Sequence, residues 1–216
     1  MIDLTALHRG PGDPAADRRR TDPYDHYVWD GLFDPDALRA AAQGYPDVGR
    51  MTQKPGIPRW FSLDLESASP ALRALCETLL SAELAEHIGA VTGTAGLRTD
   101  RTGDWGSYRV STRGAVHTAH IGGNRHPVTG WLRRYSLFTY LNEGWRDDDG
   151  GLLELWRPGA DAPSARILPV FNRSVLIETT DRSLHGVSEV LGSRPRRMVT
   201  VHFWTTSPGP DGRDLT

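Results

Sequence analysis

The sequence predicts a mainly β protein with N-terminal helices, arranged as a β-sandwich or jelly roll. After about residue 95, short β-rich runs alternate with Gly, Pro, Asp and Asn, and no helical pattern separates them. Before that point, helix start and stop signals recur. We therefore expect the helices to pack on one outer face of a sheet.

Composition narrows the class of protein. The chain has 216 residues and a net charge of −2 with neutral histidines, which suits a single domain, residues 1–216, with a sizeable core. Without a basic excess, the composition does not favour nucleic acid or a membrane surface as a partner. Cys76 is the only cysteine, so no intramolecular disulfide is possible. The N-terminus has no apolar leader, and we expect a cytoplasmic protein.

The first 95 residues predict an arm, a strand and three helices. Residues 1–23 are rich in Pro, Gly, Asp and Arg, which indicates a loose arm. Residues 24–95 then provide a strand, "YDHYVWDGLF", and supporting helices. In "DPDALRAAAQGYP" and "SASPALRALCETLLS", an Asp or Ser before a Pro opens a helix, and "AELAEHIGAVTG" predicts a third helix that ends on a glycine.

Residues 96–206 predict the β-rich core. Eight runs indicate strands: "WGSYRVS", "AVHTA", "RRYSLFTYLN", "GGLLELW", "ARILPV", "SVLIETT", "SLHGVSEV" and "RRMVTVHFW". His117 and His185 each lie at the end or start of one of these strands. Because a jelly roll brings distant strands together, the two imidazoles can face one another, and such a pair suits a first-row transition metal.

An ordered series of landmarks runs through the same region. It includes "RRYSLFTYLNEGW", "DDGGLLELWRPG", "RILPVFNRSVLIETTDRSLHGVSEV" and "RPRRMVTVHFW". Together these segments resemble the catalytic core of the prolyl-hydroxylase-like iron(II)/2-oxoglutarate oxygenases. The resemblance covers about residues 105–206 and implies a double-stranded β-helix, a cupin-like jelly roll. It also implies iron(II), 2-oxoglutarate and O2 as cofactors.

The resemblance implies residue roles. His117 and His185 would be the proximal and distal iron ligands, and Arg196 would bind the far carboxylate of 2-oxoglutarate, which a guanidinium can hold in bidentate fashion. Thr200 shares the face of Arg196 on an extended strand, and Tyr140 matches a position where the family often places a phenol. Plain sheet packing is the alternative role for Tyr140 and Thr200.

Two neighbouring arginines are rivals for the 2-oxoglutarate role. Arg197 should point to the opposite face of the strand from Arg196, because side chains alternate along a strand. Arg194 precedes a proline and is expected in the turn before the strand.

Ala119 stands where the family's His-x-Asp motif has its metal-binding aspartate. A methyl group cannot bind iron. We expect His120 to point away from the His117 face, so that it would bind metal only if the chain turned sharply there.

Three explanations fit the alanine. Ala119 can leave a coordination position open for a halide, which resembles the radical halogenases of the family and would add chloride to the cofactors. Alternatively, Ala119 can be an engineered Asp-to-Ala change in a hydroxylase. Thirdly, the barrel can be a non-catalytic small-molecule-binding module. The first reading predicts C–H chlorination of a small molecule such as an amino acid or a nucleotide.

Substrate selectivity is expected from side chains near the barrel mouth. The candidates are Trp60 and Phe61 in "IPRWFSLD", and Arg109, Trp131, Arg133 and Trp145. Arginine and tryptophan suit a small molecule that carries a carboxylate or a phosphate, although each residue can equally belong to the core or the surface. The sequence leaves open the oligomeric state and whether a carrier protein presents the substrate.

Overall fold

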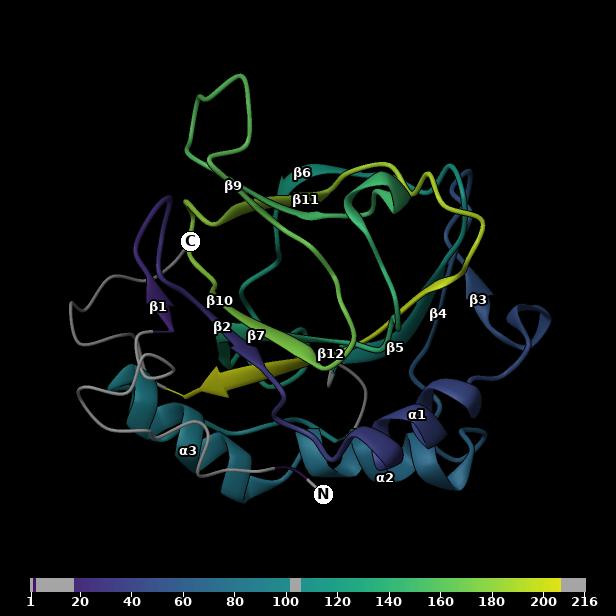
Figure 1. Cartoon of the computed structure of the whole chain (residues 1–216). Helices are drawn as coiled ribbons and strands as arrows, with labels where there is room; N and C mark the ends of the chain where they lie inside the picture. The colour runs from purple at the N-terminus through teal and green to yellow at the C-terminus, as the bar shows by residue number, and fades with distance from the viewer. Residues whose placement is uncertain (1, 3–17, 102–105, 207–216) are drawn as a thin grey trace.

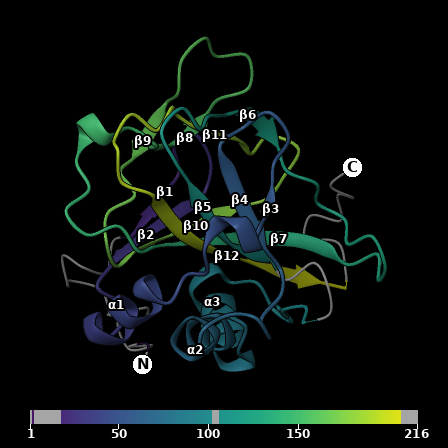
Figure 2. The same cartoon turned by 90° about the vertical axis from the view of Figure 1, so that its right-hand side faces the viewer.

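Two antiparallel β-sheets face one another, and α-helices cover the outer surface of the larger sheet (Figure 1). The structure is a computed structural model, and it describes residue 2 and residues 18–101 and 106–206. Turned by 90°, it shows the same order of layers, from the helices through the larger sheet to the smaller one (Figure 2). This double-stranded β-helix confirms the predicted fold class.

Within the described residues, the larger sheet has eight strands and the smaller sheet has four. The spatial order of the larger sheet is β1 (Arg19–Arg20), β2 (His26–Asp30), β10 (Arg173–Glu178), β7 (Leu132–Tyr140), β12 (Arg196–Thr205), β5 (Gly106–Ser111), β4 (Arg59–Ser62) and β3 (Thr52–Gln53). The order of the smaller sheet is β6 (His117–Ile121), β11 (Leu184–Val187), β8 (Leu153–Trp156) and β9 (Ala165–Ile167). Strands distant in the sequence are therefore neighbours.

The helices begin and end where the sequence signals place them. Their bounds are α1 (Pro35–Gln43), α2 (Pro70–Leu79) and α3 (Ala82–Thr92), with short 3-10 helices η2 (Val48–Arg50) and η3 (Asp147–Asp149). The side chains of Asp34 and Ser69 accept hydrogen bonds from backbone N–H groups in the first turns of α1 and α2. Gly93 ends α3 with a left-handed φ of 70°. In the described part of the chain, every helix is too short or too polar to cross a membrane.

The main core lies between the helices and the larger sheet. Val199, Val201 and Phe203 of β12 are buried there together with Leu72 and Leu79 of α2. Because strand side chains alternate, the intervening residues of β12 point into the space between the two sheets. One face of β12 therefore packs in the main core, and its other face lines the interior between the two sheets.

All eight predicted β-rich runs contain a strand, and two expectations need correction. Arg19–Arg20 forms β1 and pairs with β2, so this part of the expected arm belongs to the sheet, whereas residues 1 and 3–17 lie outside the described residues. The sequence also gave no prediction of β3 and β4, which extend the larger sheet beside β5. Strands of two and four residues are too short to carry a clear alternation.

Candidate functional site

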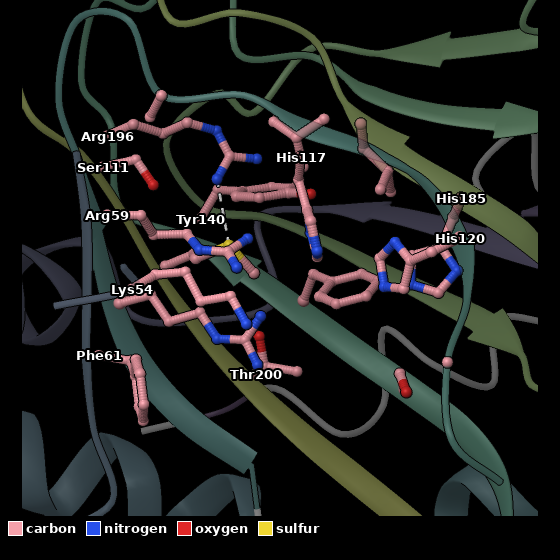
Figure 3. Close-up of a pocket in the computed structure, with 18 of the residues that line it drawn as sticks. Lys54, Arg59, Phe61, Ser111, His117, His120, Tyr140, His185, Arg196 and Thr200 are labelled. Atoms are coloured by element: carbon pink, nitrogen blue, oxygen red, sulfur yellow. Dashed lines mark hydrogen bonds between the residues drawn. The ribbon is translucent and has the colours of Figure 1, made fainter. Parts of the chain in front are cut away.

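A cavity of about 420 Å³ lies between the two sheets. Side chains from β4, β5, β7 and β12 line it on the larger sheet, and side chains from β6 and β11 line it on the smaller sheet. Figure 3 shows these side chains converging from both walls. The cavity brings together residues that are far apart in the sequence, as an enclosed binding site requires.

Strict alternation along β12 directs four side chains into the cavity. Arg196, Met198, Thr200 and His202 line it, whereas Arg197 faces the other side of the sheet. The predicted shared face of Arg196 and Thr200 is therefore confirmed, as is the opposite orientation of Arg197. His202 lies two residues beyond Thr200, on the same face.

Arg196 is held rigidly at one end of the cavity. Its Nε donates a hydrogen bond to the carbonyl oxygen of Gly151 at 2.8 Å, and its guanidinium lies 5.0 Å from the centre of the Tyr140 ring. Gly151 has a φ of 67°, and a Cβ there would lie 2.8 Å from Cδ of Arg196. The second glycine of the Gly-Gly turn is thus required for this close approach.

Three buried polar atoms beside Arg196 have no hydrogen-bond partner among the described residues. They are Nη2 of Arg196, the hydroxyl of Tyr140 and Oγ1 of Thr200. Tyr140 pairs with Met198, midway between Arg196 and Thr200, so the three atoms belong to adjacent positions on one sheet face. Burial raises the pKa of the Tyr140 phenol, and the charge of Arg196 opposes that increase. A guanidinium and two hydroxyls suit a carboxylate, the end group of 2-oxoglutarate.

His117 and His185 lie on the smaller sheet, in β6 and β11. Nδ1 of His185 lies 2.9 Å from the carbonyl oxygen of Ser183, which leaves Nε2 for another partner. Burial, together with neighbouring positive charges, lowers the pKa of His117 to about 3 and that of His185 to about 4, although the hydrogen bond to the Ser183 carbonyl opposes the shift of His185. Both rings are therefore neutral at pH 7, the form in which imidazole binds a metal such as iron(II).

His120 also faces the cavity, contrary to the expectation from simple alternation. Its ring centre lies 4.0 Å from that of His117 and 4.6 Å from that of His185 (Figure 3). The cause is an irregularity in the pairing of β6 with β11. His120 pairs with His185 and His117 pairs with Val187, so β6 contains one residue more than β11 between these two pairs. This β-bulge returns His120 to the His117 face.

The bulge also changes the position of Ala119. The side chain of Ala119 is exposed and does not line the cavity. The extra residue of β6 turns Ala119 outward, away from His117 and the cavity. Within the described part of the chain, no three His, Cys, Asp or Glu side chains form a ready-made metal site.

The cavity lining is strongly cationic. Its charged residues are Lys54, Arg59, Arg109, Arg133 and Arg196, and the described lining contains no Asp or Glu. Burial, together with repulsion from Arg59, Arg133 and Arg196, lowers the pKa of Arg109 to about 10. The guanidinium is still charged at pH 7, and the lining therefore favours negatively charged contents.

The candidate substrate residues fall into two groups. Phe61, Arg109 and Arg133 line the cavity, whereas Trp60 does not. Trp131 and Trp145 do not, and the expectation that they contact a substrate there needs correction. Trp131 is half-exposed and packs under Arg98, 5.0 Å from the guanidinium carbon to the ring centre. Trp145 is buried, and its indole N–H donates to the carbonyl oxygen of Gly150 at 2.9 Å. Both tryptophans stabilise loops.

Arg194 lies outside the cavity, as its place before a proline predicts. It donates hydrogen bonds to the carbonyl oxygens of Glu143 and Gly144 at 2.7 and 2.8 Å, and to the carboxylate of Asp149 at 2.7 Å. Arg194 thus fixes the loop before β8 and is not a rival to Arg196.

Three charged or titratable residues of the lining, Lys54, Arg59 and His202, were not among the predicted site residues. Lys54 and Arg59 come from the segment around β3 and β4, which carries no strong strand signal. His202 received no predicted role, although its spacing from Arg196 and Thr200 places it on their face. Its Nδ1 lies 2.9 Å from the hydroxyl of Ser136, and both residues line the cavity.

Comparison with known proteins agrees with this geometry. A protein-family model described as the 2OG-Fe(II) oxygenase superfamily matches residues 106–205, just under half of the chain. The match begins with β5 and ends with β12, so it contains both histidine strands and the Arg196 strand. No protein with a curated description matches the sequence.

Solved structures share the fold over most of the chain. A prolyl-4-hydroxylase from Pseudomonas putida has a TM-score of 0.64 and 22% identity, over 83% of this chain and 92% of its own. HygX from Streptomyces hygroscopicus, solved with nickel, 2-oxoglutarate and hygromycin B, has a TM-score of 0.56 and 16% identity, over 88% and 90% of the two chains. AviO1 from Streptomyces viridochromogenes Tue57 has a TM-score of 0.56 and 17% identity, over 100% and 99%. At these identities the similarity establishes the fold.

Proposed function

Because residues 106–205 match the family model of the 2OG-Fe(II) oxygenase superfamily, we propose that this enzyme oxidises a C–H bond of a small, negatively charged molecule. The observation that carries the proposal is the division of one cavity into a histidine side and an arginine side. The first side offers neutral imidazoles, and the second offers unpaired donors for a carboxylate. An iron centre and 2-oxoglutarate need these two kinds of partner.

His117 and His185 would hold the iron. Both are neutral, and the carbonyl oxygen of Ser183 engages Nδ1 of His185, which leaves Nε2 as the nitrogen that would bind the metal. Iron and 2-oxoglutarate, when bound with O2, supply the oxidising power, with succinate and CO2 as the co-products. The residues of the chain orient the partners and enclose them between the sheets.

Arg196 would bind the far carboxylate of 2-oxoglutarate, with the hydroxyls of Tyr140 and Thr200 as additional donors. All three side chains are buried and line the cavity, and each carries a polar atom that a carboxylate oxygen would satisfy. The Gly151 carbonyl holds Arg196 in place in advance, which reduces the entropic cost of binding.

The substrate would be an anion, such as a carboxylate or a phosphate ester. After one guanidinium is assigned to 2-oxoglutarate, four further cationic side chains line the cavity: Lys54, Arg59, Arg109 and Arg133. Their charges repel one another across the cavity, and a bound anion would offset that repulsion. An amino acid, an organic acid or a nucleotide would provide the compensating charge.

Halogenation is the second candidate function. The cavity lining has no carboxylate to bind the metal, and residue 119 is an alanine where an aspartate would otherwise follow His117. A chloride would then supply the missing negative charge at the metal. The outward position of Ala119 weakens this candidate, and the products distinguish the two reactions.

The test uses purified protein loaded anaerobically with iron(II) and 2-oxoglutarate. Oxygen is then admitted in buffers with either chloride or bromide, against a panel of amino acids, organic acids and nucleotides. We expect succinate and a product heavier than its substrate by one oxygen atom. Products with the mass of the added halogen would instead establish halogenation. Protein that binds neither iron(II) nor 2-oxoglutarate would leave only a non-catalytic binding module.

A further inference from the structure

We propose that His120 is the third protein ligand of the metal, in the place where a carboxylate at residue 119 would otherwise bind. The inference rests on the iron site proposed above and specifies a residue that the His-x-Asp pattern does not contain. It makes the donor set three imidazoles from two neighbouring strands. It also predicts that the metal binds in a position that the β-bulge of β6 has created.

The pairing of β6 with β11 carries the argument. Directly paired residues in an antiparallel sheet point to the same side, and residues two apart on one strand do so as well. His185 and Val187 both line the cavity, so their partners His120 and His117 must face it too. Had β6 continued from His117 without the bulge, residue 119 would pair with His185. The bulge moves His120 into that pairing position.

Gly186 indicates that the bulge is a built feature of the fold. Gly186 lies opposite the extra residue of β6, and a Cβ on it would lie 2.7 Å from the carbonyl oxygen of His117. The same Cβ would lie 3.0 Å from the backbone nitrogen of Ala119. The bulged backbone therefore presses against Gly186, and only a residue without a side chain leaves room for it.

The orientation of the His120 ring suits a ligand. Its Nδ1 lies 3.1 Å from the carbonyl oxygen of Thr118, as Nδ1 of His185 does with Ser183 at 2.9 Å. In both residues the carbonyl engages Nδ1 and leaves Nε2 for a metal. As they stand, the three rings do not yet surround one metal position. His120 is half-exposed on an edge strand, and the proposal requires its side chain to rotate toward the metal on binding.

A third imidazole has a chemical consequence. It occupies the coordination position that a halide would need, and it adds no negative charge to the cationic cavity. 2-Oxoglutarate and the substrate would then supply all the negative charge near the metal. With His120 bound, oxygenation is the expected outcome and not halogenation.

The test compares the wild type with His120→Ala, His185→Ala and His87→Ala. His87 is a half-exposed histidine of α3 that does not line the cavity, so its variant removes an imidazole elsewhere and serves as the matched control. Co(II) is titrated into each metal-free protein by calorimetry. We expect His120→Ala and His185→Ala to lose similar affinity, about 100-fold or more, because loss of an outer-shell partner alone costs about 10–100-fold. His87→Ala should bind as the wild type does.

A second readout counts the nitrogen ligands without any turnover. Cu(II)-loaded wild type and His87→Ala should show electron paramagnetic resonance splitting from three imidazole nitrogens, and His120→Ala splitting from two. Wild-type affinity and three nitrogens in His120→Ala would overturn the inference and leave the proposed function intact. A wild type that binds no metal would overturn both. Thermal unfolding of each variant verifies that the fold is retained.

Discussion

β12 and β6 line the same cavity from different sheets, and their surroundings differ. β12 lies between β7 and β5 in the larger sheet, whereas β6 is an edge strand with β11 as its one neighbour in the smaller sheet. An extra residue in a central strand disrupts two ladders of hydrogen bonds, and in an edge strand it disrupts only one. From Arg196 to His202, β12 keeps strict alternation, while β6 accommodates a bulge. The arginine side of the cavity, on β12, therefore has a rigid geometry. The histidine side, on β6, is the one where the geometry can vary.

The largest effect is expected on the rigid side, from Arg196→Leu. Removing the guanidinium leaves a buried carboxylate of 2-oxoglutarate without its charged partner, a loss of about 2–5 kcal/mol, or about 30-fold or more in affinity. Calorimetric titration of the metal-loaded protein with 2-oxoglutarate measures it. Arg197→Leu is the matched control on the opposite face of β12. Equal weakening by both variants would mean that the alternation does not define the site.

The next effect tests the bulge through Gly186→Ala. The added methyl group would press on the backbone of β6, and overpacking of this kind costs about 1–3 kcal/mol. For a chain of this size, the melting temperature should fall by about 2–4 °C for each kcal/mol. Gly123→Ala is the control, because a Cβ there would have nothing within 4 Å. If the two variants melt alike, β6 does not press against β11 as described.

Acidification should lower the free energy of unfolding through His202, the buried histidine of β12. Burial, with Arg133 and Arg109 nearby, holds the pKa of His202 well below 6.5. Below pH 6.5 the unfolded chain thus binds a proton that the folded protein does not, so the free energy of unfolding falls as the pH falls. One such group contributes up to about 1.4 kcal/mol per pH unit. His202→Gln should lower that slope in denaturant titrations of metal-free protein between pH 7 and 5. An unchanged slope would show that His202 is protonated in the fold.

The smallest effect is expected from Ala119→Asp. In the bulged strand this side chain is exposed and points away from the cavity, so the new carboxylate should change the affinity for Co(II) by no more than about threefold, the scale of a surface substitution. A large gain in affinity would instead indicate that β6 pairs without the bulge. Ala119→Asp would then restore a two-histidine, one-carboxylate site.

The same contrast decides how far the sequence could predict the site. The resemblance to the oxygenase family indicated Arg196, and the spacing correctly placed Thr200 on the same face, because nothing interrupts the alternation of β12 between them. The orientation of His120 depends on the pairing of β6 with β11, which lies more than 60 residues later in the chain. The spacing of residues within β6 cannot predict the bulge that this pairing produces. Lys54 and Arg59 reach the cavity from segments whose strand pattern is too short to detect. The fold was predictable because the turn and cap signals are local.

The cationic lining has a consequence for competition among ligands. A cavity with five positive side chains and no described carboxylate attracts any small anion, including chloride, phosphate and sulfate. 2-Oxoglutarate and the substrate must displace such ions when they bind. Each measured affinity then reports the replacement of a bound buffer anion by the ligand. The identity of the buffer anion, and not the ionic strength alone, should therefore set the apparent affinity of this enzyme for its substrates.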